Sequence, residues 1–320
     1  MSRPPHFQAY LALAAVCFFW GTTYLGIRMA LEWLHPLALM SLRYLISGSA
    51  MLAAAFFSKA HLPSGRELVY TALFGVITIG VGTGSLAFAE LWIPSGLAAL
   101  FVTTSPFWMI GVEALVPGGD RLHGPTLFGM LVGLMGTALL VGPSAAEQGW
   151  SGPLLKGFLL LQFGSSGWAL GSILQRRLKT KAHPVISAAV QQLATGIAFA
   201  LLAIALKKVP AAWSWRGAGA ILYLAVFGGM IGYSAYVYAL SKLPVSVASI
   251  YTYINPIVAV WLGWVFYREQ IGVREIVAMS IIFLGVALVK RYGSRATARP
   301  RTPAAQAPVS LDADEQRTAV

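Results

Sequence analysis

Residues 20–36 read WGTTYLGIRMALEWLHP, and residues 168–184 read WALGSILQRRLKTKAHP. The two stretches share their least common residues at a constant separation of 148: Trp20 with Trp168, Arg28 with Arg176, and His35-Pro36 with His183-Pro184. Common residues often match by chance, but tryptophan and a His-Pro pair that recur in the same order indicate an internal repeat. This repeat decides the architecture that we expect.

The repeat extends over almost the whole chain. Gly48 matches Gly196 at the same separation, and small insertions then change the separation to 150 and 149. The later matches are Gly82 with Gly232, Ala89 with Ala239, Pro94 with Pro244, Pro106 with Pro256, and Asp120 with Glu269. We therefore expect two equivalent domains, at residues 7–142 and residues 154–290.

The composition places the chain in a membrane. Its 320 residues are 57% hydrophobic and 11% charged, with a mean hydropathy of +0.70. Soluble domains carry about a quarter of charged residues, so this composition excludes a soluble or disordered chain and predicts contact with a lipid bilayer. The net charge of +12 does not indicate a nucleic-acid partner, because the basic residues lie between or after the apolar runs. Cys17 is the only cysteine, which excludes an intramolecular disulfide and a cysteine metal cluster.

Ten apolar runs are long enough to cross a bilayer as helices, and lone strands could not satisfy their backbone groups in lipid. They are approximately Phe7–Ile27, Pro36–Phe57, Leu68–Leu91, Ser95–Val116, Pro125–Val141, Leu154–Gln175, Pro184–Leu206, Gly217–Leu240, Val245–Tyr267 and Val273–Val289. Each half of the repeat holds five, so the second half enters the membrane from the opposite side. The predicted fold is an all-α membrane protein of ten transmembrane helices, arranged as two inverted five-helix repeats.

The basic residues predict the orientation of these helices. With the N-terminus inside, the inner segments carry 14 Lys and Arg residues and the outer segments carry 7. Cytoplasmic loops are enriched in these residues, so we expect both termini in the cytoplasm. After Tyr292 the apolar runs end and Pro, Ala, Thr and Arg dominate, which predicts a disordered cytoplasmic tail over residues 293–320.

Two prolines, Pro106 and Pro256, occupy equivalent positions midway along the fourth and ninth predicted helices. Proline removes one helix hydrogen bond and frees a carbonyl four residues back. Paired helix interruptions near the middle of the membrane are typical of a transport site. Asn255, the only asparagine, precedes the second proline. The alternative is a pair of kinks that packing accommodates.

Arg43 and Glu90 are charged residues at similar depth in the second and third predicted helices. Charges at this depth must face protein or water. Two interpretations stay open: an ion pair that locks the helices, or a functional arrangement in which Arg43 binds a substrate carboxylate and Glu90 is a gate or a proton site. The repeat mate of Arg43 is Gln191, so only one half carries this charge.

Aromatic residues complete the predicted site. Trp20 and Trp168 are repeat mates in polar surroundings, and a wet cavity would supply the hydrogen-bond partners that buried aromatic residues need. Packing in lipid or in the core is the alternative for any single ring. The predicted substrate-binding residues are Trp20, Thr23, Arg43, Glu90, Pro106, Trp168, Gln191, Tyr233, Tyr236, Tyr251, Asn255 and Pro256. No lysine lies midway along a predicted helix, which favours amino acids or similar small amphipathic metabolites over phosphate-rich substrates.

These residues resemble the EamA family of the drug/metabolite transporter superfamily over about residues 10–290. The resemblance rests on Trp20-Gly21, Arg43, Pro106, Trp168, Tyr253-x-Asn255-Pro256 and Glu269. Within the family, Ala89-Glu90 followed by Pro94-Ser95-Gly96 and Ala98-Ala99 resembles a subgroup of bacterial inner-membrane exporters. The chain departs from the family pattern at Arg268, where glycine is usual before the glutamate, and at Ala169, where the first half has Gly21.

The resemblance implies export of a small-molecule substrate across a bacterial inner membrane, through a cavity lined by helices 1–4 and 6–9. Motifs of enzymes and of ATP binding are absent from the sequence. We therefore expect no catalysis and no cofactor or metal, and we expect alternating access driven by a gradient. Broad-specificity drug efflux is the alternative within transport, and a non-transporting scaffold or sensor is the alternative of another class. Gly-x-x-x-Gly motifs at Gly129 and Gly167 favour a monomer or a weak homodimer.

Overall fold

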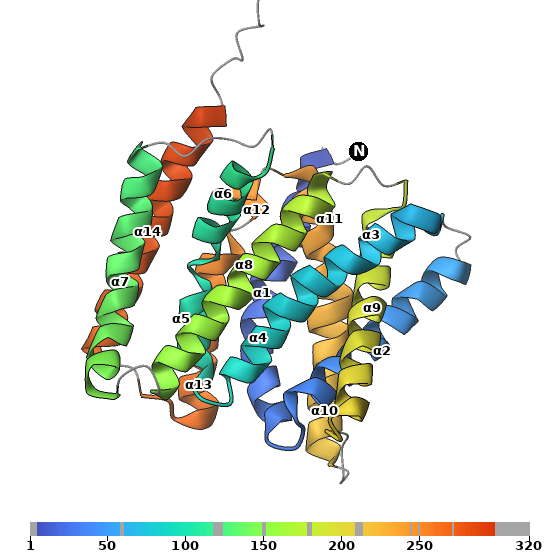
Figure 1. Ribbon diagram of the computed structural model, residues 1–320, viewed down its shortest axis with the longest axis horizontal. Helices are drawn as coiled ribbons and strands as arrows, with labels where there is room; N and C mark the ends of the chain where they lie inside the picture. The colour runs from blue at the N-terminus through green and yellow to red at the C-terminus, as the bar shows by residue number, and fades with distance from the viewer. Residues whose placement is uncertain are drawn as a thin grey trace, which may run out of the picture.

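The computed structural model describes residues 5–57, 61–117, 124–148, 152–177, 181–208, 214–243, 245–248, 250–270 and 272–297. Within these ranges the regular structure is helical (Figure 1). The first half contains α1 (Pro5–Leu31), α2 (Pro36–Phe57), α3 (Gly65–Gly75), η1 (Val76–Val81), α4 (Gly82–Ala89), α5 (Ser95–Val102), α6 (Ser105–Leu115) and α7 (Gly124–Gln148). The second half contains α8 (Pro153–Arg177), α9 (Pro184–Ala205), α10 (Trp215–Tyr223), η3 (Leu224–Tyr233), α11 (Ser234–Lys242), α12 (Val245–Ala248), α13 (Tyr251–Tyr267) and α14 (Val273–Thr297).

The helices run roughly along one direction, so the bundle has two ends (Figure 1). We call one end the upper end: α3 and α9 begin there, and α8 finishes there. We call the other end the lower end: there α1 is followed by α2, and α4 is followed by α5. Helix α1 begins and α14 finishes at the upper end (Figure 1). The chain therefore starts and ends its helical part on the same side.

Eight continuous helical segments of the described residues are long and apolar enough to cross a membrane. They are Phe7–Leu31, Pro36–Phe57, Gly65–Ala89, Ser95–Leu115, Gly124–Pro143, Pro153–Arg177, Pro184–Ala205 and Trp215–Lys242. These segments coincide with the first eight predicted crossings to within a few residues. The ninth and tenth predicted segments are mostly helical, as α12, α13 and α14, but they are not among these eight. Ten crossings thus stay a prediction.

The end of α14 differs from the expectation. Residues 293–297, which the sequence assigned to a disordered tail, continue α14 as helix to Thr297. The rest of the predicted tail, residues 298–320, lies outside the described residues.

Helices α2 and α9 cross at two glycines that the repeat pairs with each other. A Cβ atom at Gly48 would lie 2.5 Å from the main-chain nitrogen of Leu193, and one at Gly196 would lie 2.6 Å from that of Leu45. Only glycine allows the two backbones to come this close. Beside the crossing, the hydroxyl of Ser47 donates a hydrogen bond to Oε1 of Gln192. The two halves are therefore joined through this crossing.

The Gly-x-x-x-Gly motifs pack within the chain. In α7, Gly133 faces Gly285 of α14. A Cβ added to Gly285 would lie 2.3 Å from the main-chain nitrogen of Gly133. In α8, Gly167 and Gly171 pack against Val81 and Thr78 of η1. Both motifs therefore pack against other helices of the same chain, and the expectation of a monomer or a weak homodimer stays a prediction.

The two proline positions behave differently. Pro106 is the second residue of α6, where its missing N–H costs nothing, and the chain turns at Thr103 and Thr104 just before it. Pro256, in contrast, lies inside α13. The second interruption comes earlier, before Tyr251. The expected symmetric pair of breaks at the prolines is therefore wrong for the second half.

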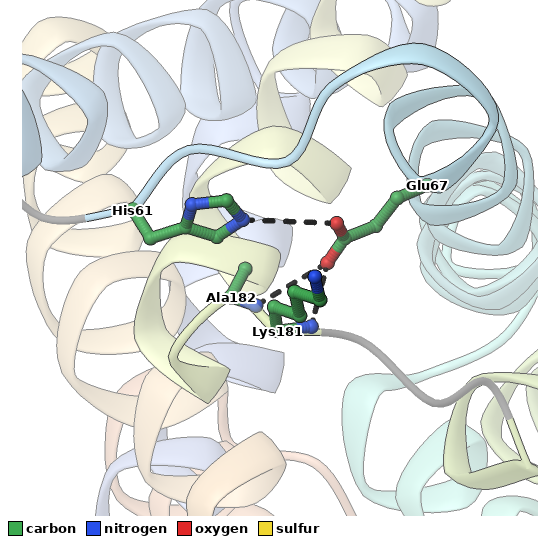
Figure 2. A network of polar contacts seen from close by, with 4 residues as sticks. All are labelled: His61, Glu67, Lys181 and Ala182. Atoms are coloured by element: carbon green, nitrogen blue, oxygen red, sulfur yellow. Dashed lines mark hydrogen bonds and ion pairs between the residues drawn. The ribbon is translucent and has the colours of Figure 1, made fainter.

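A carboxylate ties the two halves together at each end. At the upper end, Glu67 of α3 accepts hydrogen bonds from the main-chain N–H groups of Lys181 (2.9 Å) and Ala182 (3.2 Å), and His61 Nε2 lies 3.8 Å from its other oxygen (Figure 2). We call this contact the upper clamp. At the lower end, Glu269 accepts from the N–H groups of Ser95 and Gly96 at the start of α5. We call this contact the lower clamp.

Candidate functional site

A cavity of about 720 Å³ lies in the lower half of the bundle, between both halves of the chain. Its lining includes Trp20, Thr23, Tyr24, Arg43, Tyr44, Thr83, Val102, Ser105, Ser165, Trp168, Gly228, Tyr233, Tyr251 and Asn255. Most of this lining is aromatic or apolar with a few polar groups, which is typical of small-molecule sites. We call it the central cavity.

The two tryptophans that line this cavity contact each other. The rings of Trp20 and Trp168 contact edge to face, with centroids 5.3 Å apart. Each ring occupies the space left by a glycine of the other half. A Cβ added to Gly82 would lie 2.8 Å from Trp168, and a Cβ added to Gly232 would lie 2.5 Å from Trp20. The indole N–H of Trp20 donates to the carbonyl of Gly228 at 3.1 Å. The matched Trp and Gly positions of the repeat thus hold both indoles in place.

Three tyrosines extend this contact into an aromatic cluster of Trp20, Trp168, Tyr233, Tyr236 and Tyr251. The centroid of Trp20 lies 5.1 Å from that of Tyr236 and 5.1 Å from that of Tyr251. The indole N–H of Trp168 donates to the hydroxyl of Tyr236 at 3.1 Å. The three tyrosines are buried and the two tryptophans are partly buried. The members come from α1, α8, η3, α11 and α13, so the cluster is a junction of helices from both halves.

Arg43 is the charged residue among those that line the central cavity. It is 3% exposed, and its guanidinium lies 4.9 Å from the ring centroid of Tyr44. Within the described part of the chain, Nε and Nη1 of Arg43 have no hydrogen-bond partner. An added Cβ at Gly228 would lie 2.4 Å from Nη2, so η3 passes directly beside the guanidinium. Two N–H donors of a buried cation therefore stay available to a ligand.

The expected ion pair between Arg43 and Glu90 is not formed. Glu90 follows α4 at the lower end, is 1% exposed, and neither carboxylate oxygen has a hydrogen-bond partner among the residues described. The cation beside it is Arg28, whose Nη1 donates to the main-chain oxygen of Glu90 at 2.8 Å. Similar depth in two helices did not bring the side chains together, because the two helices present these residues toward different neighbours.

Asn255 lies at the wall of the cavity and not at a broken helix. The side-chain amide of Asn255 is assigned the orientation in which its nitrogen donates to the main-chain oxygens of Tyr251 (3.1 Å) and Cys17 (3.0 Å), because this orientation satisfies both ends of the amide. Thr23, which also lines the cavity, donates to the main-chain oxygen of Trp20 at 2.7 Å. Both side chains thus hold the backbone that shapes the cavity.

The structure brings seven of the twelve predicted residues to the central cavity: Trp20, Thr23, Arg43, Trp168, Tyr233, Tyr251 and Asn255. The other five lie elsewhere. Pro106 and Tyr236 line a small neighbouring cavity, Gln191 lines a cavity near the upper end, Pro256 is buried in α13, and Glu90 lies at the lower end. The main reason is that sequence position gives depth along a helix but not the direction of a side chain.

Several lining residues were not predicted, among them Tyr24, Tyr44, Ser165 and Gly228. Both η1 and η3 are π-helical, and they begin at residues 76 and 224, which the repeat pairs at a separation of 148. Such wider turns are frequent at functional sites because they rotate the residues that follow. The clustered glycines at Gly80, Gly82, Gly228 and Gly229 were the available signal.

Comparisons with known proteins agree with this arrangement. The sequence model of the EamA-like transporter family matches residues 7–142 and 155–291. Over 281 residues the chain is 33% identical to the Escherichia coli (strain K12) protein named uncharacterized inner membrane transporter YedA. This alignment covers 87% of this chain and 89% of that protein. It is 21% identical over 285 residues to an uncharacterized transporter of Archaeoglobus fulgidus, covering 89% of this chain and 99% of that protein.

A solved structure has the same fold at 22% identity, with a TM-score of 0.68 over 90% of this chain and 98% of that chain. The family match extends over both halves of the chain, including every residue of the central cavity named above. The chain therefore belongs to the EamA-like transporter family, and it is a membrane transporter.

Proposed function

We propose that this protein is a secondary exporter of small amphipathic carboxylate-bearing metabolites, with amino acids as the main class. In this proposal it is an inner-membrane protein of ten transmembrane helices. The helices form two inverted repeats, residues 7–142 and 154–290, and both termini are cytoplasmic. The upper end of the bundle then faces the cytoplasm.

Arg43 is the observation that carries the substrate class. A buried guanidinium whose Nε and Nη1 have free N–H groups can donate charge-assisted hydrogen bonds to a carboxylate. A cation at this depth is costly, so an anionic group that pairs with it is strongly favoured over a neutral one. The central cavity offers this charge at one place only, which fits one carboxylate better than a polyanion.

The aromatic lining supports an apolar body for the substrate. Trp20, Trp168, Tyr233 and Tyr251 present ring surface to the cavity, and burial of apolar surface contributes roughly 25 cal/mol per Å². Polar groups such as Ser165 and Thr83 are few beside these rings. An amino acid with an aliphatic or aromatic side chain combines the carboxylate and the apolar body.

Alternating access is supported by a barrier between two cavities. Four members of the aromatic cluster line the central cavity, and one of them, Tyr233, donates a hydrogen bond at 2.5 Å to Oε1 of Gln191, which lines the cavity near the upper end. A carrier that opens to one side at a time needs such a barrier on the closed side. Rearrangement of the barrier would connect the central cavity to the upper end.

The test is transport by the purified full chain in proteoliposomes. We expect uptake of labelled L-phenylalanine or L-leucine, and we expect L-phenylalaninamide, which lacks the carboxylate, to compete poorly. Arg43→Gln removes two charge-assisted hydrogen bonds, each worth roughly 1.5–3 kcal/mol, and should weaken the apparent affinity for the acid at least tenfold.

Arg43→Lys is the matched control, because it keeps the charge but loses the planar set of N–H donors. Its affinity should lie between those of the parent and Arg43→Gln. Equal competition by acid and amide, unchanged by Arg43→Gln, would refute the carboxylate site and favour broad-specificity efflux. Absence of any transport or binding would favour a scaffold or sensor.

A further inference from the structure

A second cavity, of about 780 Å³, lies near the upper end of the bundle. Its lining comes from α3, α8, α9 and α11, and it includes Thr71, Gln175, Arg176, Ser187 and Gln191. None of these residues lines the central cavity. We call it the upper cavity.

Buried polar groups without partners gather on this lining. Thr71 is 2% exposed, Ser187 is 3% exposed and Gln191 is fully buried. Within the described ranges, Oγ1 of Thr71, Oγ of Ser187, Nε2 of Gln191 and Oε1 of Gln175 have no hydrogen-bond partner. Each such group costs roughly 1–3 kcal/mol when it stays unsatisfied, so four of them on one surface indicate a surface that receives a polar ligand.

The chemistry of these groups is that of an anion site with one acceptor. Two hydroxyls and the Gln191 amide can donate, Arg176 adds a positive charge, and Gln175 Oε1 can accept. A carboxylate needs donors and a cation, and an ammonium group needs an acceptor. Val237 and Leu240 supply an apolar side of the same cavity. The set therefore matches an amphipathic amino acid, the class proposed for the central cavity.

Gln191 connects the two cavities. Its Oε1 accepts the hydrogen bond from Tyr233, whose ring lines the central cavity, while its Nε2 belongs to the upper cavity. The repeat pairs Gln191 with Arg43 at a separation of 148. Arg43 lines the central cavity, and its repeat mate Gln191 lines the upper cavity. A ligand that draws the Gln191 amide toward itself would weaken the contact with Tyr233.

The upper clamp joins the two helices, α3 and α9, that supply part of this lining. Glu67 binds the main chain at Lys181 and Ala182, just before α9 (Figure 2). Thr71 lies one helical turn after Glu67 on α3, and Ser187 and Gln191 lie on α9. The clamp thus fixes the two helices that carry three of the unpartnered groups.

We propose that the upper cavity is a second binding site, which takes the carboxylate-bearing substrate at the upper end before it passes the Tyr233–Gln191 bond into the central cavity. This inference rests on the proposed function for the identity of the ligand. Thr71, Ser187 and Gln191 bind the carboxylate together with Arg176, and Gln175 accepts from the amino group.

The test uses single cysteines in the full chain with Cys17 replaced by alanine. Ser187→Cys places the thiol in the upper cavity, and Ser165→Cys places one in the central cavity. A membrane-impermeant maleimide is added to proteoliposomes of known orientation, from the side of the upper end to label Ser187→Cys and from the side of the lower end to label Ser165→Cys. We expect Ser187→Cys to react, and we expect L-phenylalanine to slow this reaction at least fivefold while L-phenylalaninamide does not.

Gln191→Ala in the same background should raise the protecting concentration of L-phenylalanine about tenfold. Tyr233→Phe, which removes only the hydroxyl, should make Ser165→Cys react faster from the upper side. If Ser187→Cys does not yield folded protein, Thr71→Cys reports on the same cavity and is expected to be protected in the same way.

The outcomes separate this inference from the proposed function. Protection at Ser165→Cys without protection at Ser187→Cys or Thr71→Cys would overturn the second site and leave the central site intact. Protection in the upper cavity alone would support the second site and refute the central one. A lack of protection at every position would overturn both proposals.

Discussion

The crossing of α2 and α9 gives a prediction whose size follows from the geometry. Gly48→Ala places a methyl group where the main-chain nitrogen of Leu193 is 2.5 Å away and its Cα is 2.8 Å away. Ordinary contacts of a Cβ lie at 3.4–4 Å, so the helices must separate by roughly an ångström or the chain must bend. The backbone of Leu193 cannot move aside as a flexible side chain could.

Overpacking of this kind costs roughly 1–3 kcal/mol, and a helical alanine recovers up to about 1 kcal/mol relative to glycine. The crossing also positions Ser47 and Gln192, which hydrogen-bond beside it, and Arg43 lies about one turn away on the same helix. We therefore expect Gly48→Ala to lower stability by roughly 1–2 kcal/mol and to reduce transport in parallel. Gly196→Ala, on the other helix, should behave in the same way.

The assay is thermal unfolding of the purified protein in detergent, followed by transport at a temperature where all variants stay folded. Gly219→Ala is the matched control, because no atom lies within 4 Å of its added Cβ and it is also in a helix. The control should unfold at the same temperature as the parent or slightly above it. If Gly48→Ala and Gly219→Ala were equally stable, the close approach of α2 and α9 would be refuted.

Two further predictions concern carboxylates. Glu269→Gln keeps one acceptor oxygen of the lower clamp but removes the charge that faces the N-terminus of α5, and it should cost roughly 1–2 kcal/mol of stability in thermal unfolding. The control is Glu113→Gln, which loses an exposed pair with Arg177 and should change stability by less than about 1 kcal/mol. Equal effects of the two substitutions would count against the lower clamp. Because Arg43 and Glu90 share no partner, the losses of transport caused by Arg43→Gln and Glu90→Gln should be additive in a double-mutant cycle, and a coupling energy above roughly 0.5 kcal/mol would show that they interact.

The sequence alone determined the helices and their repetition. Apolar runs of about 20 residues must be helical in lipid, because only a helix satisfies its own backbone, and this reasoning placed the first eight spans within a few residues of the observed ones. The repeat also identified residues that matter together. Trp20, Trp168, Gly82 and Gly232 were matched by position before any contact between them was known.

The tertiary structure decided which of these residues meet. Position along a helix gives depth, but the direction of a side chain depends on how the helix is rotated against its neighbours. Arg43 and Glu90 have similar depth and different neighbours for this reason. The π-helical turns η1 and η3 add a rotation that no periodicity in the sequence revealed.

Contacts across the repeat could be decided only by packing. Each tryptophan fills the space beside a glycine of the opposite half, and Gln191 reaches the central cavity only through the hydroxyl of Tyr233. The sequence records both partners of such a contact, but their distance depends on how closely two helices approach. In this protein the glycines at the α2–α9 crossing permit that approach, because a side chain there would hold the two backbones apart.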